Sequence, residues 1–259
     1  MDALRIMTYN VHSCRGVDGR TRPERILKVI RKSNPDVVAL QELDGPAASH
    51  DFAQALGMRH FYVEARSKGS TGFGNALLTR FPADLVRQEA LPRLSPQQEP
   101  RAAQRLRVHT SFGSVEIVNT HLGLSDAERV LQVDKLLSVD WLAEVTGAQY
   151  SVLCGDLNAR PGSPAYRRLT ERLRDAQTSL GQGQSTFPSL FPIVRIDHVF
   201  TNDLLVARHA EVPVGTLARL ASDHRPLVVD LSPVQTNQAP FARGKSSSSA
   251  PLERDVLVE

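Results

Sequence analysis

Short apolar runs recur along this chain, and in several of them hydrophobic and polar residues alternate. Residues 106–109, Leu-Arg-Val-His, are one example, and a period of two is typical of a strand that buries one face. A second run follows after Phe112-Gly113-Ser114, so we expect a hairpin there. Eight runs predict strands, and they lie at residues 6–9, 37–40, 76–78, 107–110, 115–119, 152–154, 196–200 and 227–231.

Capping and stop residues at the ends of helices predict where helices lie between these strands. Thr21 caps a helix that Asn34-Pro35 stops, with Pro23 in its first turn, and Ser125 with Glu128 forms a second capping box. Strands and helices do not alternate strictly, which favours an α+β fold of packed mixed sheets with helices outside. The four helices run from Thr21 to Asn34, from Ala48 to Leu56, from Ser125 to Gly147 and from Ser163 to Leu173.

The composition narrows the class of protein. The 259 residues, 41% of them hydrophobic, are enough for a sizeable core. No apolar stretch reaches the roughly 18 residues of a membrane span, and the N-terminus has no basic region before an apolar one, so we expect no transmembrane segment and no secretory signal. Cys14 and Cys154 show no metal-type spacing, so we expect reduced thiols and a cytoplasmic location.

The C-terminal region differs in composition from the rest. After Ser232 the sequence is polar and carries no periodic pattern. We therefore expect one domain over residues 1–232 and a disordered tail over 233–259. The net charge of +3 is too small to indicate general coating of nucleic acid.

Polar residues stand at the ends of several apolar runs. Gly155-Asp156-Leu157-Asn158 follows the run at 150–154, and the alternation of a strand points its Asp and Asn to the same side. Each such residue also has a structural explanation, as a turn former, a solvated strand end or a hydrogen-bonded core histidine. The whole set is harder to explain in that way, and it comprises Asn10, Glu42, His121, Asp156, Asn158, Asp197, Asp223 and His224.

This set supports a specific chemistry. Oxygen ligands without clustered sulfur or imidazole suit Mg²⁺ or Mn²⁺. Two histidines can act as acid, base or hydrogen-bond donor to a phosphate, and an Asp that binds one imidazole nitrogen favours its charged form. Asp197 lies between Ile196 and Val199, so we expect it to be desolvated and to need a partner. The sequence indicates metal-assisted attack of water on a phosphate ester.

The motifs that carry these residues resemble those of the endonuclease/exonuclease/phosphatase superfamily. The resemblance implies a four-layer α/β/β/α sandwich, in which two mixed β-sheets pack face to face with helices outside. The matching motifs are Thr8-Tyr9-Asn10-Val11, Leu40-Gln41-Glu42, Gly74-Asn75-Ala76-Leu77-Leu78, Asn119-Thr120-His121-Leu122, Gly155-Asp156-Leu157-Asn158, Ile196-Asp197-His198-Val199-Phe200 and Ser222-Asp223-His224-Arg225-Pro226.

The resemblance also implies a role for each polar residue on the metal side. Glu42, with Asn10 near it, would hold the Mg²⁺ or Mn²⁺, and Asp223 would be a further acid at or beside the metal. Asp156 and Asn158 would orient or activate the attacking water and touch the phosphate.

The two histidines would face the phosphate. Asp197 would pair with His224, whose imidazolium steadies the scissile phosphate, and His121 would be the second phosphate-facing imidazole. Abasic-site nucleases of this superfamily carry a Tyr followed by Pro-Asn where this chain has Asn119-Thr120-His121-Leu122. The His form is more similar to the pancreatic DNase, sphingomyelinase and inositol-phosphatase branches.

The sequence leaves three possible functions open. We expect a phosphodiesterase for a small or lipid-derived phosphate ester, because residues 12–20, 186–188 and 191–192 resemble small bacterial members associated with lipid metabolism. The alternatives are a DNA or RNA nuclease and a non-catalytic binding module. Asn75, Arg15 and Arg101 are candidate substrate contacts, although the two arginines are equally well explained as solvated loop residues.

Overall fold

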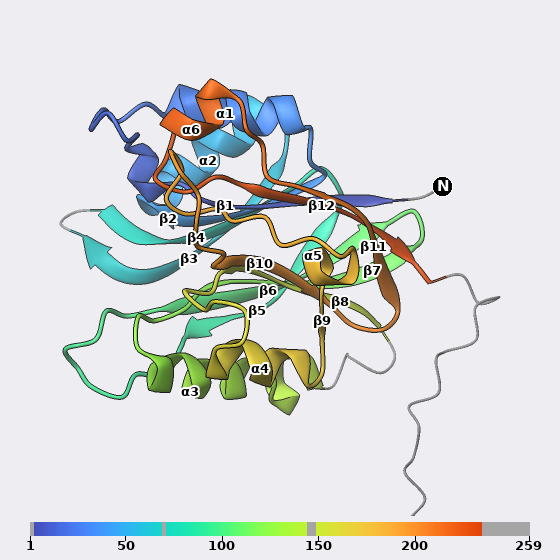
Figure 1. Ribbon diagram of the computed structural model, residues 1–259. Coiled ribbons are helices and arrows are strands. Elements are labelled where there is room, and N and C mark those ends of the chain that lie inside the picture. Colours follow the sequence, from blue (N-terminus) through green and yellow to red (C-terminus); the bar gives the residue numbers. More distant parts are fainter. Residues whose placement is uncertain (1–2, 69–70, 144–148, 235–259) are drawn as a thin grey trace, which may run out of the picture.

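Two six-stranded β-sheets lie face to face in the computed structural model, which describes residues 3–68, 71–143 and 149–234 (Figure 1). The first sheet has the order β11-β12-β1-β2-β4-β3. Its strands are β1 (Leu4–Asn10), β2 (Val37–Leu43), β3 (Arg59–Lys68), β4 (Thr71–Thr79), β11 (Leu205–Glu211) and β12 (Leu227–Pro233). The second has the order β5-β6-β7-β8-β10-β9. Its strands are β5 (Ala83–Ala90), β6 (Ala102–Thr110), β7 (Gly113–His121), β8 (Tyr150–Asp156), β9 (Arg174–Asp175) and β10 (Asp197–Thr201).

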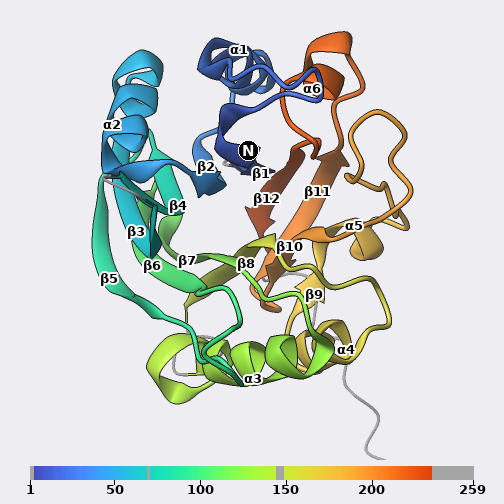
Figure 2. The same ribbon diagram turned by 90° about the vertical axis from the view of Figure 1, so that its left-hand side faces the viewer.

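Helices cover the outer face of each sheet, as Figures 1 and 2 show from two directions. The first sheet carries α1 (Pro23–Ser33), α2 (Gly45–Leu56) and α6 (Thr216–Leu220). The second carries α3 (Asp126–Leu136) and α4 (Pro164–Thr170), and shorter turns are η1 (His12–Cys14), η2 (Val139–Ala143) and α5 (Ala176–Ser179). The predicted α+β sandwich is confirmed. Within the described part of the chain, no helix has the length and apolar character to cross a membrane.

The alternation of side chains along each strand builds the four layers. In β1, Leu4 and Ile6 belong to the core between the two sheets, while Met7 and Tyr9 belong to the core beneath α1 and α2. A third core lies between the second sheet and α3 and α4, with Trp141 fully buried in it. Central strands therefore bury both faces, and the helices are held by the outward-facing side chains.

The strand directions bring distant parts of the sequence to one edge. β1 and β2 are parallel, and so are β7 and β8, so each pair ends at the same edge of its sheet. β10 runs antiparallel to β8 and begins there, with Asp197 opposite Asp156. β12 likewise begins beside the end of β1, where Leu227 pairs with Thr8. All the polar strand ends identified in the sequence meet at this edge.

The helix boundaries differ in part from the prediction. Ser125 caps α3 by accepting from the backbone N–H of Glu128 at 3.3 Å, as expected. At α1 the cap position is Arg22 rather than Thr21, and no side chain caps it. α2 starts at Gly45, before the predicted Ala48.

Two helices also end before the residue at which the sequence predicted their C-terminus. α3 ends at Leu136, and a π-type turn over Val139–Ala143 follows it, so the apolar face that suggested one long helix is divided between two elements. α4 ends at Thr170, before Leu173. The predicted stop at Gly147 lies outside the described residues, as does most of the predicted tail over 233–259. The tail was predicted to start too early, because Pro233 is the last residue of β12 and the Val234 N–H donates to Leu204 O at 2.9 Å.

Candidate active site

The eight polar residues identified at strand ends, here called the strand-end cluster, occupy one edge of the two sheets. Its members are Asn10, Glu42, His121, Asp156, Asn158, Asp197, Asp223 and His224. Asn10 lies at its centre, because its amide nitrogen donates to Glu42 Oε1 at 3.0 Å and to Asp156 Oδ2 at 2.9 Å. The cluster thus joins the first sheet to the second through one buried amide.

Glu42 is placed by an irregularity in β2. The pairing of β2 with β4 shifts register between Leu40 and Leu43, and Glu42 has a left-handed φ of 58°. This conformation is uncommon for a residue with a side chain and is often found at functional sites. Burial raises the pKa of Glu42, opposed by the Asn10 hydrogen bond and reinforced by the charges of Asp156 and Asp223.

Asp156 and Asn158 are held by a tight turn after β8. Gly155 has a φ of 144°, and a Cβ there would lie 1.9 Å from Thr120 O, so only glycine fits between β7 and β8. Asn158 has a left-handed φ of 47°, and its backbone N–H donates to Asp156 Oδ1 at 3.0 Å. The Gly-Asp-Leu-Asn motif therefore forms a tight backbone turn that directs two polar side chains into the cluster.

His224 is bound by two carboxylates. Its Nδ1 lies 2.8 Å from Asp197 Oδ2, and its Nε2 lies 3.6 Å from Asp156 Oδ2. Burial alone would lower the pKa of His224, but the charges of Asp197 and Asp156 outweigh it and raise the pKa to about 10. The predicted pair of Asp197 and His224 is present, and His224 is an imidazolium at neutral pH.

His121 has the opposite charge state. Arg101 Nη1 lies 3.1 Å from its Nδ1, and a guanidinium can only donate, so Nδ1 accepts and the ring proton resides on Nε2. That nitrogen lies 3.5 Å from Asp156 Oδ2, the acceptor it faces, and 3.1 Å from the Asn158 amide nitrogen, which donates to Leu122 O. Burial lowers the pKa of His121 to about 3, with Arg101 and His224 acting in the same direction against Asp156. His121 is a neutral donor.

Asp223 lies on the Glu42 side of the cluster, beside a histidine that the sequence reasoning missed. Its Oδ1 is 3.5 Å from His12 Nδ1 and also accepts from the Ser222 hydroxyl at 3.3 Å. The His12 backbone N–H donates to Asn10 Oδ1 at 3.1 Å. His12 follows the first motif by one residue, and this spacing was the one available signal for it.

The segment before β10 supplies two further contacts that the sequence reasoning missed. The Thr186 hydroxyl donates to Asp197 Oδ2, the oxygen that also binds His224. The Phe187 ring packs on the His224 ring with their centroids 4.9 Å apart. These residues fix the Asp197–His224 pair, and only the return of the chain toward β10 brings them there.

The three candidate substrate contacts lie in different surroundings. Asn75 is buried, and its amide donates to Ala102 O on the facing sheet at 2.9 Å. Arg101 is also buried and binds Glu99 Oε2 at 3.0 Å as well as His121. Arg15 is exposed in the loop after η1, where its backbone pairs with Thr21. The structure thus brings Arg101 to the cluster and leaves Arg15 outside it.

The donor set fits a hard divalent cation on the Glu42 side. Ligand atoms of Asp156, Asp197 and His224 lie within 4.8 Å of one another, but a protonated His224 with Nδ1 bound to Asp197 is a poor ligand. Glu42 and Asp156 instead flank the Asn10 amide group. The amide nitrogen faces both carboxylates, so the group must rotate before its oxygen can bind a cation. Carboxylate and amide oxygens are the ligands that Mg²⁺ and Mn²⁺ prefer.

Comparison with known proteins gives the same assignment over most of the chain. The model of the Endonuclease/Exonuclease/phosphatase family matches residues 7–224. The chain is 24% identical over 263 residues to the uncharacterized protein YbhP of Escherichia coli strain K12, covering 88% of this chain and 96% of that protein.

Solved structures share the fold at low sequence identity. An endonuclease/exonuclease/phosphatase from Beutenbergia cavernae is 24% identical with a TM-score of 0.71, covering 90% of this chain and 72% of that one. The human Nocturnin catalytic domain with bound sulfate is 23% identical with a TM-score of 0.70, covering 90% and 94%. A mannosyl-6-phosphatase from Bacteroides thetaiotaomicron is 18% identical with a TM-score of 0.69, covering 88% and 99%.

Proposed function

Because the chain belongs to the endonuclease/exonuclease/phosphatase family, we propose that it is an Mg²⁺- or Mn²⁺-dependent hydrolase of phosphate esters, and specifically a phosphodiesterase. Members of this family are typically metal-dependent hydrolases of phosphoesters. The observation that carries the proposal is the strand-end cluster itself, in which an imidazolium, a neutral imidazole and four buried or half-buried acids converge. This combination matches the needs of phosphoryl chemistry.

Glu42 and Asn10 would hold the metal, with Asp156 and Asp223 beside them. The bound ion would neutralise phosphate charge and make a coordinated water more acidic. The raised pKa of Glu42, caused by burial together with Asp156 and Asp223, supports this placement. Several acids close together in a buried place are less costly when a cation lies among them.

His224 would act on the substrate from the side away from Glu42, and Asp156 lies between His224 and the metal ligands. The Nε2–H of the His224 imidazolium is free of its Asp197 partner and can donate to a phosphate oxygen, where charge grows in the transition state. Asp156 can accept the proton of the attacking water, because its carboxylate faces the same space as His224 Nε2.

Asn158 and His121 would complete the phosphate contacts. His121 directs its Nε2–H toward Asp156 Oδ2, and the Asn158 amide nitrogen, a second donor, lies 3.1 Å from His121 Nε2. Because His121 is neutral, it can donate a hydrogen bond to the phosphate without transferring a proton to Asp156. We expect a small or lipid-derived phosphodiester as the substrate, because residues 12–20, 186–188 and 191–192 resemble small bacterial members associated with lipid metabolism.

A substrate panel with metal controls tests the function. Phosphodiesters, phosphomonoesters, nucleic acids and phospholipids are each incubated with Mg²⁺, Mn²⁺ or EDTA. We expect hydrolysis of a phosphodiester that EDTA abolishes and that Asp156→Asn reduces by at least about a hundredfold. Asp84→Asn is the matched control, because Asp84 is an exposed carboxylate on β5 bound to His109. Activity that resists EDTA, or full activity of Asp156→Asn, would refute the mechanism.

The same panel decides the substrate class. Cleavage of plasmid or oligonucleotide with a steep fall as salt rises would identify a nuclease instead. Preference for a phosphomonoester would identify a phosphatase and overturn the phosphodiester assignment, while leaving the metal mechanism in place.

A further inference from the structure

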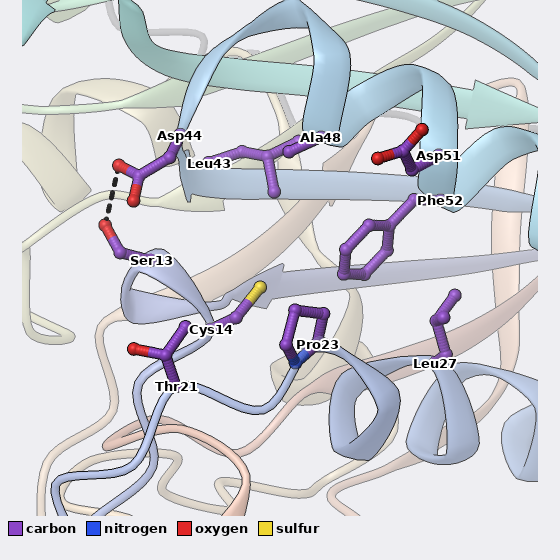
Figure 3. A pocket seen from close by; sticks show the side chains of 10 residues that line it. All are labelled: Ser13, Cys14, Thr21, Pro23, Leu27, Leu43, Asp44, Ala48, Asp51 and Phe52. Atoms are coloured by element: carbon purple, nitrogen blue, oxygen red, sulfur yellow. Dashed lines mark hydrogen bonds between the residues drawn. The ribbon is translucent and has the colours of Figure 1, made fainter. Parts of the chain in front are cut away.

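A cavity of about 200 Å³ lies between α1 and α2, next to the strand-end cluster but outside it. Figure 3 shows the rings of Pro23 and Phe52 and the side chains of Cys14, Leu27 and Leu43 around one common space. No member of the strand-end cluster lines it. Apolar cavities of about 150 Å³ already hold a benzene ring, so this cavity can hold a small organic group.

The cavity shares two chain segments with the metal side of the cluster. Ser13 and Cys14 line it, and the residue before them, His12, contacts Asp223 and donates its backbone N–H to Asn10. Leu43 and Asp44 also line it and directly follow Glu42. The Ser13 hydroxyl donates to Asp44 Oδ1 at 2.9 Å and joins the two segments at one end of the cavity (Figure 3).

The first of these segments has an unusual backbone. His12, Ser13 and Cys14 have φ values of 47°, 50° and 57°, three left-handed residues in succession without a glycine. Such a turn is disfavoured for L residues and persists because its surroundings hold it. The side chain of Cys14, which is 5% exposed, is packed against the cavity on one side. Packing on that side therefore stabilises the turn that carries His12.

The two charged side chains that line the cavity are both carboxylates. Asp44 stands at one end and Asp51, which is exposed, at the other (Figure 3). Burial raises the pKa of the Cys14 thiol to about 12, and the charges of Asp44 and Glu24 act in the same direction. The Phe52 ring adds an aromatic face that attracts a cation. Anionic molecules are disfavoured for the same reason.

We propose that this cavity is an effector site for a small monocation with an apolar ring or branched alkyl group, and that its occupancy strengthens metal binding at the strand-end cluster through the η1 turn. The coupling to metal rests on the proposed function, whereas binding in the cavity does not. The occupant is separate from the phosphate ester, because the cavity and the cluster share backbone segments but no lining side chain.

Titration calorimetry of the full chain with benzylamine measures binding in the cavity directly. We expect benzylamine to bind with a dissociation constant of about 1 mM, typical of so small a ligand. Benzyl alcohol should bind more weakly, and benzoate should not bind. Asp51→Asn should weaken benzylamine at least about threefold and leave benzyl alcohol unchanged.

Coupling to the metal is measured by titration calorimetry with Mn²⁺. Saturating benzylamine should raise the Mn²⁺ affinity at least about threefold, and Mn²⁺ should raise the benzylamine affinity by the same factor. Ala48→Phe, which fills the cavity, should abolish both effects, whereas Ala47→Phe, at an exposed position on the same helix, should keep them.

Several results would overturn the proposal. They are no binding of benzylamine, equal binding of benzoate, an unchanged Mn²⁺ affinity, or competition of benzylamine with a phosphate ester. If Ala48→Phe does not fold, the Asp51→Asn comparison still decides the charge selection. A chain that binds Mn²⁺ but hydrolyses no phosphate ester would refute the proposed function alone, since the two titrations need no turnover.

Discussion

Asp197→Asn is the sharpest test of the proposed active site. The substitution keeps the shape of the side chain and a group that can accept from Thr186, but it removes the negative charge 2.8 Å from His224 Nδ1. Without that charge the pKa of His224 should fall from about 10 toward the ordinary value near 6.5. The change corresponds to roughly 5 kcal/mol of lost preference for the imidazolium.

The fall in pKa predicts a loss of rate that depends on pH. His224 is charged below its pKa and neutral above it, so the wild-type chain should keep its imidazolium up to about pH 10. In Asp197→Asn only about 3% of His224 would be charged at pH 8, and about three quarters at pH 6. We therefore expect a loss of about 30-fold at pH 8 and of less than about twofold at pH 6.

The assay is a pH–rate profile from 5.5 to 9.5 at saturating Mn²⁺, with the best phosphodiester from the panel. Nuclear magnetic resonance of the His224 ring gives its pKa in the same variant without turnover. Asp175→Asn is the matched control, because it removes a buried carboxylate from another histidine, His198, at 3.1 Å. That variant should keep the wild-type profile.

Two results would refute the reasoning. If Asp197→Asn loses the same factor at pH 6 and pH 8, the charge of His224 does not limit the rate. If its His224 ring still titrates above pH 9, Asp156 rather than Asp197 sets the pKa.

Three further predictions concern metal binding and stability. Glu42→Gln should weaken Mn²⁺ binding at least about tenfold by calorimetry, and an unchanged affinity would move the metal elsewhere. Asn119→Ala should lower the free energy of unfolding in urea by about 3 kcal/mol, because Asn119 binds Leu40 O, Ala76 O and Gln41 across the sheets; a change below about 1 kcal/mol would contradict this. Burial would raise the pKa of Asp175, but His198 and Arg195 outweigh it and lower the pKa to about 2. Asp175→Asn should then cost about 2 kcal/mol above pH 4, and this difference should shrink as the pH falls through 2; a difference that does not change with pH would refute it.

The strands that the sequence pattern missed share one property. β3, β5, β9 and β11 are the four edge strands of the two sheets. An edge strand can expose much of its surface, as β5 does along most of its length, so its apolar alternation is weak and it resembles a loop in sequence. The central strands were found because they bury both faces and are rich in β-branched residues.

The strand-end cluster was predicted more completely than its surroundings. Its residues sit in short motifs next to buried strands, and the parallel pairs β1–β2 and β7–β8 bring their ends together. His12, Thr186 and Phe187 contact the cluster from loops, where no periodic pattern marks them. Asn75 lies in a matching motif, yet its amide binds Ala102 O on the facing sheet, a contact set by how the sheets pack.

The sequence by itself determined the central strands, the fold class and the identity of the polar residues, because these follow from local periodicity and short motifs. The family resemblance already implied an imidazolium at His224, and only the tertiary structure decided that His121, in the same cluster, is neutral. His121 is neutral because it is buried against Arg101, and His224 is charged because it is buried against Asp197 and Asp156. A pKa depends on neighbours within a few ångströms, and here these neighbours come from distant parts of the chain.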